Sequence, residues 1–353
     1  MAQGGCSSPV EVARVPERET DLAEREAMFY DVVGERTDCR LCPWRCHIAP
    51  GQVGRCQVRR NVGRRLVSLN YGEVTSVALD PIEKKPLYHF HPGALILSVG
   101  TFGCNLKCGF CQNWQISQER PPTRRLLPQA AAELARQYAA EGNIGLAYTY
   151  NEPFIWYEYV RDTAPLIHAA GLYNVLVTNG IVEAEPLEEL LPFVDAMNVD
   201  IKSMSDQFYQ KHCRGQALPA RQTVERAFGR THVEITNLII PGENDSDDEL
   251  RALVDWAASV SPELPVHFSA YHPDYQCAAP PTPPATLQRA YGLAREKLKF
   301  VYVGNLRLDG TTDTVCPQCG QTLVVRRGMT GTITGLDERG RCAACGSGAN
   351  VRL

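Results

Sequence analysis

The chain has 353 residues, 14 of them cysteine, and a net charge of −4 at pH 7. This length allows one large core domain with smaller modules. The sequence has no run of about eighteen apolar residues, so no membrane-spanning helix is predicted. A disulfide-stapled secreted scaffold is excluded, because eleven cysteines fall into clusters with metal-ligand spacing. The N-terminus also has no apolar signal-peptide core, so we expect a cytoplasmic protein that binds no membrane.

The N-terminal region is predicted to hold a tail and a small metal module. Residues 1–35 are expected to form the tail and then a charged, solvated helix from Glu17 to Val33. The module covers 36–66 and carries four cysteines, Cys39, Cys42, Cys46 and Cys56. A segment this short cannot build a hydrophobic core of its own, so we expect a metal to crosslink the four thiols. The alternative is that the thiols are buried and bind no metal. Their spacing fits a second iron–sulfur cluster or a structural Zn²⁺ and does not separate the two.

The same module is strongly basic. Eight arginines face the single acid Asp38, which gives +7 across Arg36, Arg40, Arg45, Arg55, Arg59, Arg60, Arg64 and Arg65. Such a surplus of positive charge can bind nucleic acid, dock an acidic protein partner, or simply keep the surface solvated. We favour solvation or docking of a flavodoxin or ferredoxin reductant. Nucleic acid is unlikely, because no aromatic side chains are interleaved to stack on bases.

Alternating strands and helices are predicted over 67–305. Val67–Tyr71 and Val74–Leu79 suggest a hairpin, and His89 and His91 behind it are interpreted as packing residues rather than metal ligands. The apolar run that begins at Leu95 predicts a buried strand.

The loop after this strand holds three cysteines at spacing x3 and x2, namely Cys104, Cys108 and Cys111. A structural zinc site needs four ligands, which this loop does not supply. An iron–sulfur cubane held by three thiolates keeps one iron open for an exogenous ligand. The loop therefore predicts a reactive cluster rather than a plain electron relay.

With Phe110 directly before the third cysteine, this loop resembles the CxxxCxΦC signature of radical S-adenosylmethionine (SAM) enzymes. The resemblance implies a [4Fe-4S] cluster whose open iron is chelated by SAM. It also implies that the reduced cluster cleaves SAM to methionine and a 5′-deoxyadenosyl radical, which abstracts a hydrogen atom.

Repeated βα units follow the loop. Strands are predicted at Gly145–Tyr150, Asn174–Thr178, Ala196–Ile201, Val233–Ile240, Val266–Tyr271 and Phe300–Val303. Helices are predicted at Pro128–Glu141, Phe154–Ala169, Pro186–Leu191, Asp206–Lys211, Ser246–Ser259 and Pro284–Glu296. The predicted fold class is α/β, a partial (β/α) barrel of radical SAM type with small cysteine-rich modules at the N- and C-termini.

Polar residues follow strand after strand, at the end where a barrel carries its active site. They are Asn151 and Glu152, Thr178 and Asn179, Asp200 and Lys202, Pro241–Asn244, and His272. In this order they resemble the relatives of pyruvate formate-lyase activating enzyme over roughly residues 80–305. The resemblance implies that the Asn151–Glu152 loop meets the SAM amino group, that Asp200 and Lys202 lie along the ribose and carboxylate, and that His272 lies near the adenosyl moiety.

Two features depart from the activating enzymes. Tyr150-Asn151-Glu152-Pro153 replaces their usual Gly-Gly-Glu-Pro turn, and the cysteine modules at both ends are additional. With the Cys111–Ser117 segment, these features look like the radical SAM component of the AmmeMemoRadiSam system. That group is encoded beside AMMECR-type and Memo-type proteins, which become candidate partners. The likeness weakens the inference that the substrate is a glycyl radical enzyme.

The C-terminal region, 306–353, carries two CxxCG knuckles with Cys316, Cys319, Cys342 and Cys345. Their β-prone, glycine-punctuated spacer predicts a zinc ribbon rather than a redox dithiol pair. Six arginines against four acids in this region are too small a surplus for a nucleic-acid footprint.

The leading function is therefore a radical SAM enzyme that acts on an unidentified metabolite or protein. A glycyl-radical-enzyme activating enzyme is one alternative. A metal-stabilised module that binds nucleic acid or protein is an alternative of another class.

Overall fold

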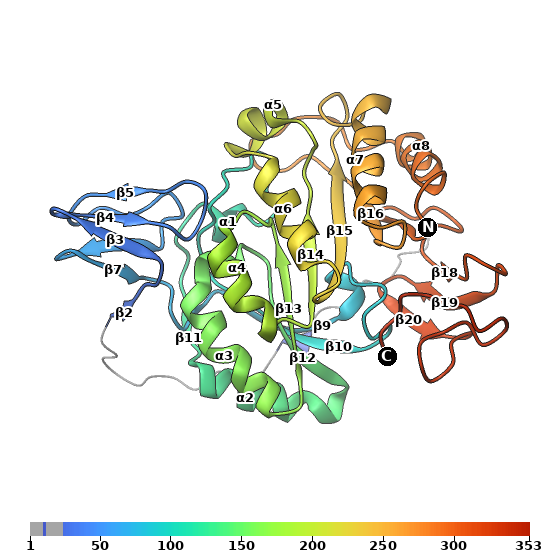
Figure 1. The fold of residues 1–353 in the computed structure, drawn as a ribbon, viewed down its shortest axis with the longest axis horizontal. Coiled ribbons are helices and arrows are strands. Elements are labelled where there is room, and N and C mark those ends of the chain that lie inside the picture. Colours follow the sequence, from blue (N-terminus) through green and yellow to red (C-terminus); the bar gives the residue numbers. More distant parts are fainter. Residues whose placement is uncertain (1–9, 12–23) are drawn as a thin grey trace.

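The computed structural model describes residues 10–11 and 24–353, and its centre is one nine-stranded sheet in the order β1-β9-β10-β12-β13-β14-β15-β16-β17 (Figure 1). The strands are β1 (Val10–Glu11), β9 (Ser76–Pro81), β10 (Leu95–Gly100), β12 (Asn143–Tyr148), β13 (Tyr173–Thr178), β14 (Ala196–Asp200), β15 (His232–Ile239), β16 (Val266–Ala270) and β17 (Val301–Gly304). From β10 to β17 each strand pairs parallel with the next. The antiparallel β9 and the short β1 extend the β10 edge. This open order confirms the predicted partial barrel.

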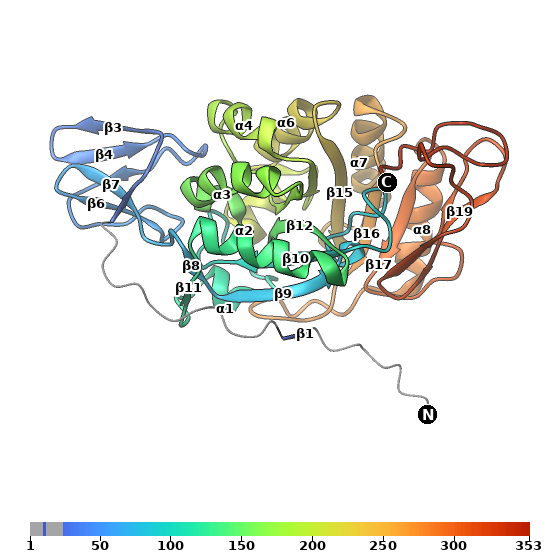
Figure 2. The same ribbon diagram turned by 90° about the horizontal axis from the view of Figure 1, so that it is seen from below.

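Helices follow the parallel strands and cover the outer side of the sheet (Figure 2). They are α1 (Trp114–Ser117), α2 (Pro128–Gln137), α3 (Tyr157–Ala169), α4 (Ala184–Leu190), α5 (Asp206–Phe208), α6 (Leu218–Ala227), α7 (Asp247–Val260) and α8 (Pro284–Arg295). The sequence explains α7 well. Ser246 caps it by accepting from the Glu249 amide, acids fill its first turn, and Leu250, Leu253 and Val254 form its buried face.

Helix α6 was not predicted from the sequence. Its buried face is built from small or weakly apolar side chains, among them Pro219, Ala220 and Thr223. Such residues give a weak hydrophobic period, so the pattern did not separate this helix from a loop.

The predicted hairpin between residues 67–71 and 74–79 is wrong. The first segment contributes to β7 (Arg65–Ser68), which pairs with β6 (Arg59–Val62) and β2 (Arg25–Glu26). The second contributes to β9, which pairs with β10 in the central sheet. Between them β8 (Glu73–Val74) pairs with β11 (Arg124–Arg125). Pairing across the chain, rather than the local turn, decides these partners.

The N-terminal module consists of two three-stranded sheets, β2-β7-β6 and β3-β4-β5. The strands of the second are β3 (Tyr30–Val33), β4 (Arg36–Cys39) and β5 (His47–Ile48). The predicted helix Glu17–Val33 is therefore wrong over residues 24–33, and 17–23 lie outside the described residues. Its charges suggested a solvated helix face, but β2 and β3 obtain their hydrogen bonds from β7 and β4.

The C-terminal ribbon has three strands, β18 (Thr314–Val315), β19 (Thr322–Arg327) and β20 (Thr330–Ile333). Figures 1 and 2 show the N-terminal module and the ribbon at opposite ends of the molecule. In the part of the chain that the structure describes, no helix is both long and apolar enough to cross a membrane.

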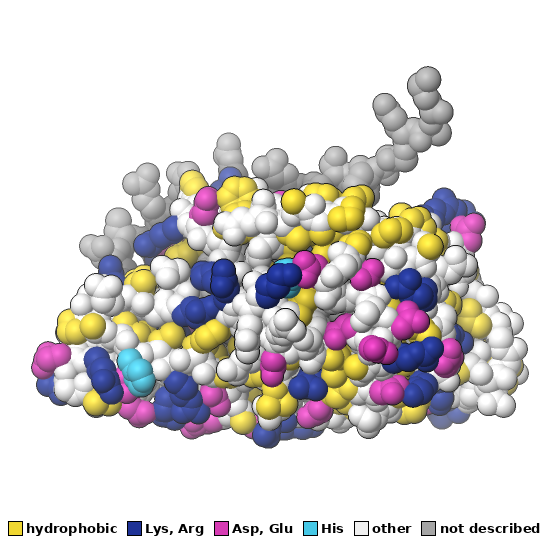
Figure 3. Space-filling view, turned by 90° about the horizontal axis from the view of Figure 1, so that it is seen from above, with side chains coloured by type: hydrophobic (Ala, Val, Ile, Leu, Met, Phe, Trp, Pro, Cys, Tyr) yellow, Lys and Arg dark blue, Asp and Glu magenta, His cyan; other side chains and the backbone are white. Residues whose placement is uncertain are grey.

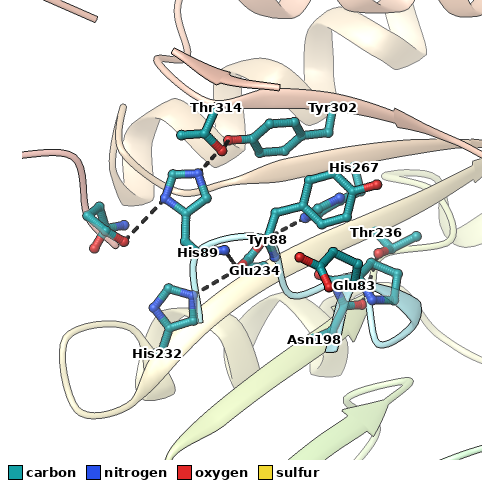
Figure 4. Close-up of polar contacts among 12 residues, drawn as sticks. Glu83, Tyr88, His89, Asn198, His232, Glu234, Thr236, His267, Tyr302 and Thr314 are labelled. Carbon is teal, nitrogen blue, oxygen red and sulfur yellow. Dashed lines mark hydrogen bonds and ion pairs between the residues drawn. The ribbon is translucent and has the colours of Figure 1, made fainter. Parts of the chain in front are cut away.

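A buried glutamate anchors the β9–β10 connection to the barrel (Figure 4). Glu234 of β15 is fully buried, and its carboxylate accepts from the amides of Tyr88 (3.0 Å) and His89 (2.7 Å). It is also paired with His232 Nε2 at 2.9 Å and His267 Nε2 at 2.6 Å. Four partners compensate for burying this carboxylate, so it fixes the connection against β15 and β16.

His89 and His91 pack, as the sequence analysis favoured. The His89 ring lies between the Tyr302 hydroxyl, 2.5 Å from Nε2, and the Asn350 carbonyl, 3.2 Å from Nδ1. A neutral ring with its proton on Nδ1 satisfies both contacts. The His91 ring centroid lies 4.6 Å from those of Phe90 and Tyr173.

The buried His89 is expected to make the protein acid-sensitive. Burial lowers its pKa to about 3, although Glu234 opposes the shift. Between about pH 6.5 and pH 3 the imidazole of His89 is protonated in the unfolded chain but not in the folded chain. The free energy of unfolding therefore falls as the pH drops through this range, by about 2 kcal/mol at pH 5. Urea titrations at pH 7 and pH 5 should show this fall in the wild type and a fall smaller by about that amount in His89→Gln. The matched control is His47→Gln, because it makes the same substitution at an exposed position. Equal falls in all three proteins would contradict the assignment.

Candidate active site at the strand ends

A cavity of about 260 Å³ opens where the parallel strands end. The short α5, which follows β14, lies at the top of Figure 1, and Figure 3 views this side of the molecule. Basic and acidic side chains are interspersed there rather than gathered by sign. Eight of the predicted site residues line the cavity: Cys104, Cys108, Cys111, Asn151, Glu152, Asn179, Asp200 and Lys202.

Two glycines let the cysteine loop pass between its neighbours. A Cβ on Gly100 would stand 2.9 Å from the Tyr150 ring. At Gly103, which has φ +86°, a Cβ would stand 2.5 Å from the carbonyl oxygen of Cys56. Both positions need glycine, the second also for its backbone conformation.

Backbone carbonyls of a π-turn hold the middle of the loop. The helix predicted at Asp206–Lys211 is α5 followed by a π-helical turn, Tyr209–Cys213. The turn leaves the Cys213 carbonyl free to accept from the Lys107 amide at 2.8 Å, and the His212 carbonyl to accept from the Gly109 amide at 2.9 Å. The cysteine loop is thereby fixed through main-chain hydrogen bonds on both sides of Cys108.

Side chains of the next two strand ends complete this support. Asn151 donates to the Gly103 carbonyl at 2.9 Å and accepts from the Thr101 amide at 3.2 Å. Asn179 donates to Asn105 Oδ1 at 2.9 Å, and its Nδ2 lies 3.6 Å from Cys104 Sγ. These amides therefore act on the cysteine loop as well as on the cavity.

Glu152 supports the site from behind. One carboxylate oxygen accepts from the Phe154 amide (2.9 Å) and the Thr178 hydroxyl (2.7 Å), and the other accepts from the Asn179 amide (2.7 Å). Burial raises its pKa to about 7 despite these hydrogen bonds. Glu152 thus fixes the strand end that carries Asn179, and Thr178 does not line the cavity.

The remaining predicted pair is an ion pair at the cavity wall. Lys202 Nζ lies 2.7 Å from Asp200 Oδ2, and both side chains are partly exposed to the cavity. Burial lowers the pKa of Lys202, but Asp200 and the nearby thiols outweigh it, so the pKa lies above its ordinary value. The lysine is charged and positioned to meet an anionic group.

His272 stands at the rim instead of inside. It is exposed, and its Nε2 accepts from the Gln112 side-chain amide at 2.9 Å. Gln112 is the one of the two that lines the cavity. His272 is thus linked to the cavity wall through Gln112, and its contact with a ligand stays a prediction.

Sequence reasoning missed several cavity residues, including Thr236, Ser269 and Asn305. The first two lie in buried strands, where a polar residue is a signal that could have found them. The same strands carry other buried polar residues, such as Glu234 and His267, so this signal alone does not single out the cavity residues. Asn305 has φ +60° directly after β17. Its loop position gave no comparable signal.

A larger cavity of about 870 Å³ adjoins the first. It lies between the end of β17, the segment 83–88 and the ribbon residues 325–329. Pro86, Ser269 and Asn305 line both cavities, so they form the common wall.

Comparison with known proteins shows the family to which this chain belongs. The model of the Radical SAM superfamily matches residues 98–257, which include the cysteine loop and the strand ends through β15. An uncharacterized protein of Methanocaldococcus jannaschii is 42% identical over 339 residues, covering 93% of this chain and 100% of that protein. The chain belongs to the radical SAM superfamily.

More distant similarities agree with the predicted radical SAM fold. The pyruvate formate-lyase 1-activating enzyme of Escherichia coli is 25% identical over 179 residues, 48% of this chain and 71% of that enzyme. A radical SAM methyltransferase of Sphaerobacter thermophilus has a TM-score of 0.50 at 18% identity, covering 70% of this chain and 72% of that one. The second likeness supports the fold alone. Assignment to the AmmeMemoRadiSam system stays a prediction.

The radical SAM family implies a [4Fe-4S] cluster and SAM, and the cavity suits both. Three thiols face it, and no fourth cysteine is among its lining residues in the described chain. A hydrogen bond with Cys213 and burial raise the pKa of Cys108, and burial raises that of Cys104. Such thiols need a compensating metal cation to ionise. Asp200 and Lys202 supply the paired charges that a zwitterion requires.

A second group of side chains that could hold a metal ion lies in the ribbon of this radical SAM protein. Cys316, Cys319, Cys342 and Cys345 place their sulfurs all within 4.8 Å of one another. Cys316 and Cys345 are 3.7 Å apart, and Cys319 and Cys342 are 3.6 Å apart. A tetrahedral ion with metal–sulfur bonds of about 2.3 Å separates its sulfurs by roughly 3.8 Å, which matches this group.

Removing the lysine charge should weaken SAM binding. Lys202→Ala is expected to raise the Kd of SAM about tenfold or more, because a charge-assisted contact contributes about 1.5–3 kcal/mol. Calorimetry on anaerobic, cluster-loaded protein measures this, with iron content as a check that the cluster is retained. Lys211→Ala is the matched control, since Lys211 pairs with Glu243 at the exposed surface. An unchanged Kd in Lys202→Ala would remove this lysine from the SAM site.

Proposed function

We propose that this chain reductively cleaves SAM at a cluster held by Cys104, Cys108 and Cys111, and that the resulting radical abstracts hydrogen from a separate substrate. The observation that carries the proposal is one cavity lined by these three thiols and by Asp200 and Lys202. The bound cluster would supply the electron that breaks a carbon–sulfur bond of SAM, giving methionine and the 5′-deoxyadenosyl radical.

The chain's own residues then bind and orient. Lys202 would hold the SAM carboxylate, with Asp200 setting the lysine position. Asn151 and Asn179 would keep the cysteine loop in register with the ligand, since both already bond to that loop. None of these groups has to move a proton.

The adjoining cavity of about 870 Å³ is the best candidate for the substrate site. Its volume falls in the range of about 300–1,000 Å³ usual for small-molecule sites. It shares a wall with the SAM cavity, so a substrate there would lie beside the site of radical formation. These features favour a small molecule or a short peptide segment over a whole protein surface.

An isotope experiment tests the proposal. The reconstituted enzyme is incubated anaerobically with SAM, dithionite and a deuterated cell extract, split into small-molecule and protein fractions. Deuterium should appear in 5′-deoxyadenosine with the small-molecule fraction. Label only from the protein fraction would favour the alternative of a glycyl-radical-enzyme activating enzyme, which the similarity to the E. coli enzyme supports. No 5′-deoxyadenosine at all would favour a metal-stabilised binding module.

We also propose that the ribbon metal is Zn²⁺, because the sulfur spacing suits a single tetrahedral ion. Cys319→Ser is expected to lower zinc by about one atom per chain while leaving iron unchanged. Cys319 is an exposed ligand, so this change tests the ion more cleanly than a truncation that would uncover His89. Equal zinc in the variant and the wild type, measured by plasma mass spectrometry, would contradict the assignment.

A flavodoxin or ferredoxin is the reductant that we propose, and AMMECR-type and Memo-type proteins stay candidate partners. The arginine-rich stretch is a weaker docking face than its +7 suggested. Six of its eight arginines form ion pairs with acids, including Arg40 with Glu185, Arg45 with Glu183 and Arg59 with Glu158.

A further inference from the structure

The four cysteines of the N-terminal module converge on one small interior space. Cys39, Cys42, Cys46 and Cys56 all line it, together with apolar side chains such as Leu41 and Ile155. Three of these thiols are buried and Cys46 is half-buried. The radical SAM site described above uses none of them.

Their sulfurs are not gathered as tightly as those of the ribbon. Among the residues that the structure describes, the ribbon quartet is the one group of three or more potential ligands whose donor atoms all lie within 4.8 Å. Neither the module's thiols nor the Cys104 loop meets that limit. A cluster places several iron atoms between its thiolates, so its sulfurs stand farther apart than those around one zinc ion. The module therefore resembles the iron–sulfur loop in its spacing and differs from the ribbon.

Nitrogen donors of the arginine-rich stretch point at these sulfurs. The Arg55 amide donates to Cys46 Sγ at 3.5 Å, and Arg59 Nη1 lies 3.9 Å from Cys39 Sγ. Arg59 is buried, and its ion pair with Glu158 holds its guanidinium group beside these sulfurs. Such donors stabilise the negative charge of a thiolate-ligated cluster and tune its potential.

The module touches the radical SAM loop on both sides of Cys104. Before that cysteine, Gly103 lies against the Cys56 carbonyl so closely that no side chain fits between them. After it, the Asn105 carbonyl accepts from Trp44 Nε1 at 2.8 Å. Cys104 is thus one residue from both contacts, and Cys56 itself makes the first of them.

We propose that Cys39, Cys42, Cys46 and Cys56 bind an iron–sulfur cluster that relays electrons to the cluster at Cys104. Four protein thiolates leave no open iron, which suits electron transfer rather than substrate chemistry. One electron passes from a low-potential carrier of the flavodoxin or ferredoxin class to the module cluster, which is oxidised again as it reduces the Cys104 cluster. No bond is made or broken in this step. The relay rests on the proposed function, whereas the metal assignment does not.

The metal is tested in full-length protein that carries Cys104→Ala, Cys108→Ala and Cys111→Ala. This variant leaves the module untouched, so it should stay brown after anaerobic reconstitution and retain iron and acid-labile sulfide. Adding Cys42→Ser and Cys56→Ser should remove that iron. An iron-free triple variant with about two zinc ions per chain would overturn the proposal. Iron that survives the two serine changes would overturn it as well.

The relay is tested with two reductants on Cys42→Ser, with Cys277→Ser as the control. SAM cleavage driven by reduced flavodoxin should fall at least about tenfold in Cys42→Ser, while dithionite, a small reductant, should still drive it. Flavodoxin-driven cleavage at the wild-type rate, in a variant that has lost the module iron, would overturn the relay. If the wild type cleaves SAM with neither reductant, the proposed function is refuted and the metal assignment still stands.

Discussion

Replacing Cys108 by alanine is expected to reduce 5′-deoxyadenosine formation to background while the fold persists. Cys108 is buried at the base of the cavity, and the loss of one of three ligands leaves the cluster without its site. Anaerobic assays with SAM and dithionite, read by mass spectrometry, measure the product. Circular dichroism checks the fold.

The control for this variant is the neighbouring buried thiol. Cys213→Ala removes a partner of Cys108 without touching the three-cysteine loop sequence, and it should keep both iron and SAM cleavage. Undiminished 5′-deoxyadenosine in Cys108→Ala would refute the cluster assignment. Loss of iron in Cys213→Ala would make that residue an additional ligand.

Removing the buried acid Glu158 is expected to destabilise the protein by about 3–5 kcal/mol, because it leaves the Arg59 charge buried and unpaired. Glu158 of α3 is ion-paired with Arg59, and its Oε1 also accepts from the Met28 amide at 2.8 Å. Arg59 in turn donates to the Met28 carbonyl at 2.7 Å. One carboxylate thus joins the N-terminal module to the barrel.

The exposed pair of Arg45 with Glu183 provides the comparison. Glu158 and Glu183 both lie outside the module, and each pairs with a different arginine of the module. Glu183→Ala should cost less than about 1 kcal/mol, because water screens that pair. Urea unfolding of Glu158→Ala, Glu183→Ala and the wild type measures the loss of unfolding free energy in each variant. Similar losses in both would show that burial does not govern these bridges.

The sequence predicted the radical SAM barrel because its signals are local. The cysteine loop and polar residues such as Asp200 stand directly after apolar runs, and parallel strands carry their ends to one side. What it missed depends on pairing between distant segments. Strand β3 obtains its hydrogen bonds from β4, and Glu158 meets an arginine 99 residues earlier. Neither contact produces a periodic pattern of apolar residues in the sequence.

Within the site, the sequence found which residues gather but not what each one does. Glu152 and Lys202 were both expected to meet the ligand. Both residues line the cavity, but the carboxylate of Glu152 accepts from three internal donors, whereas the Lys202 ammonium is paired with Asp200 at the cavity wall. Hydrogen-bond saturation of a buried group depends on the packed neighbours, so spacing alone could not separate the two roles.

The contact between Gly103 and Cys56 has a consequence for maturation. The cysteine loop closes against a wall that the N-terminal module provides, and ribosomes make that module first. A module that has not assembled leaves the loop without this wall, so delivery of metal to the N-terminal thiols would precede delivery to Cys104.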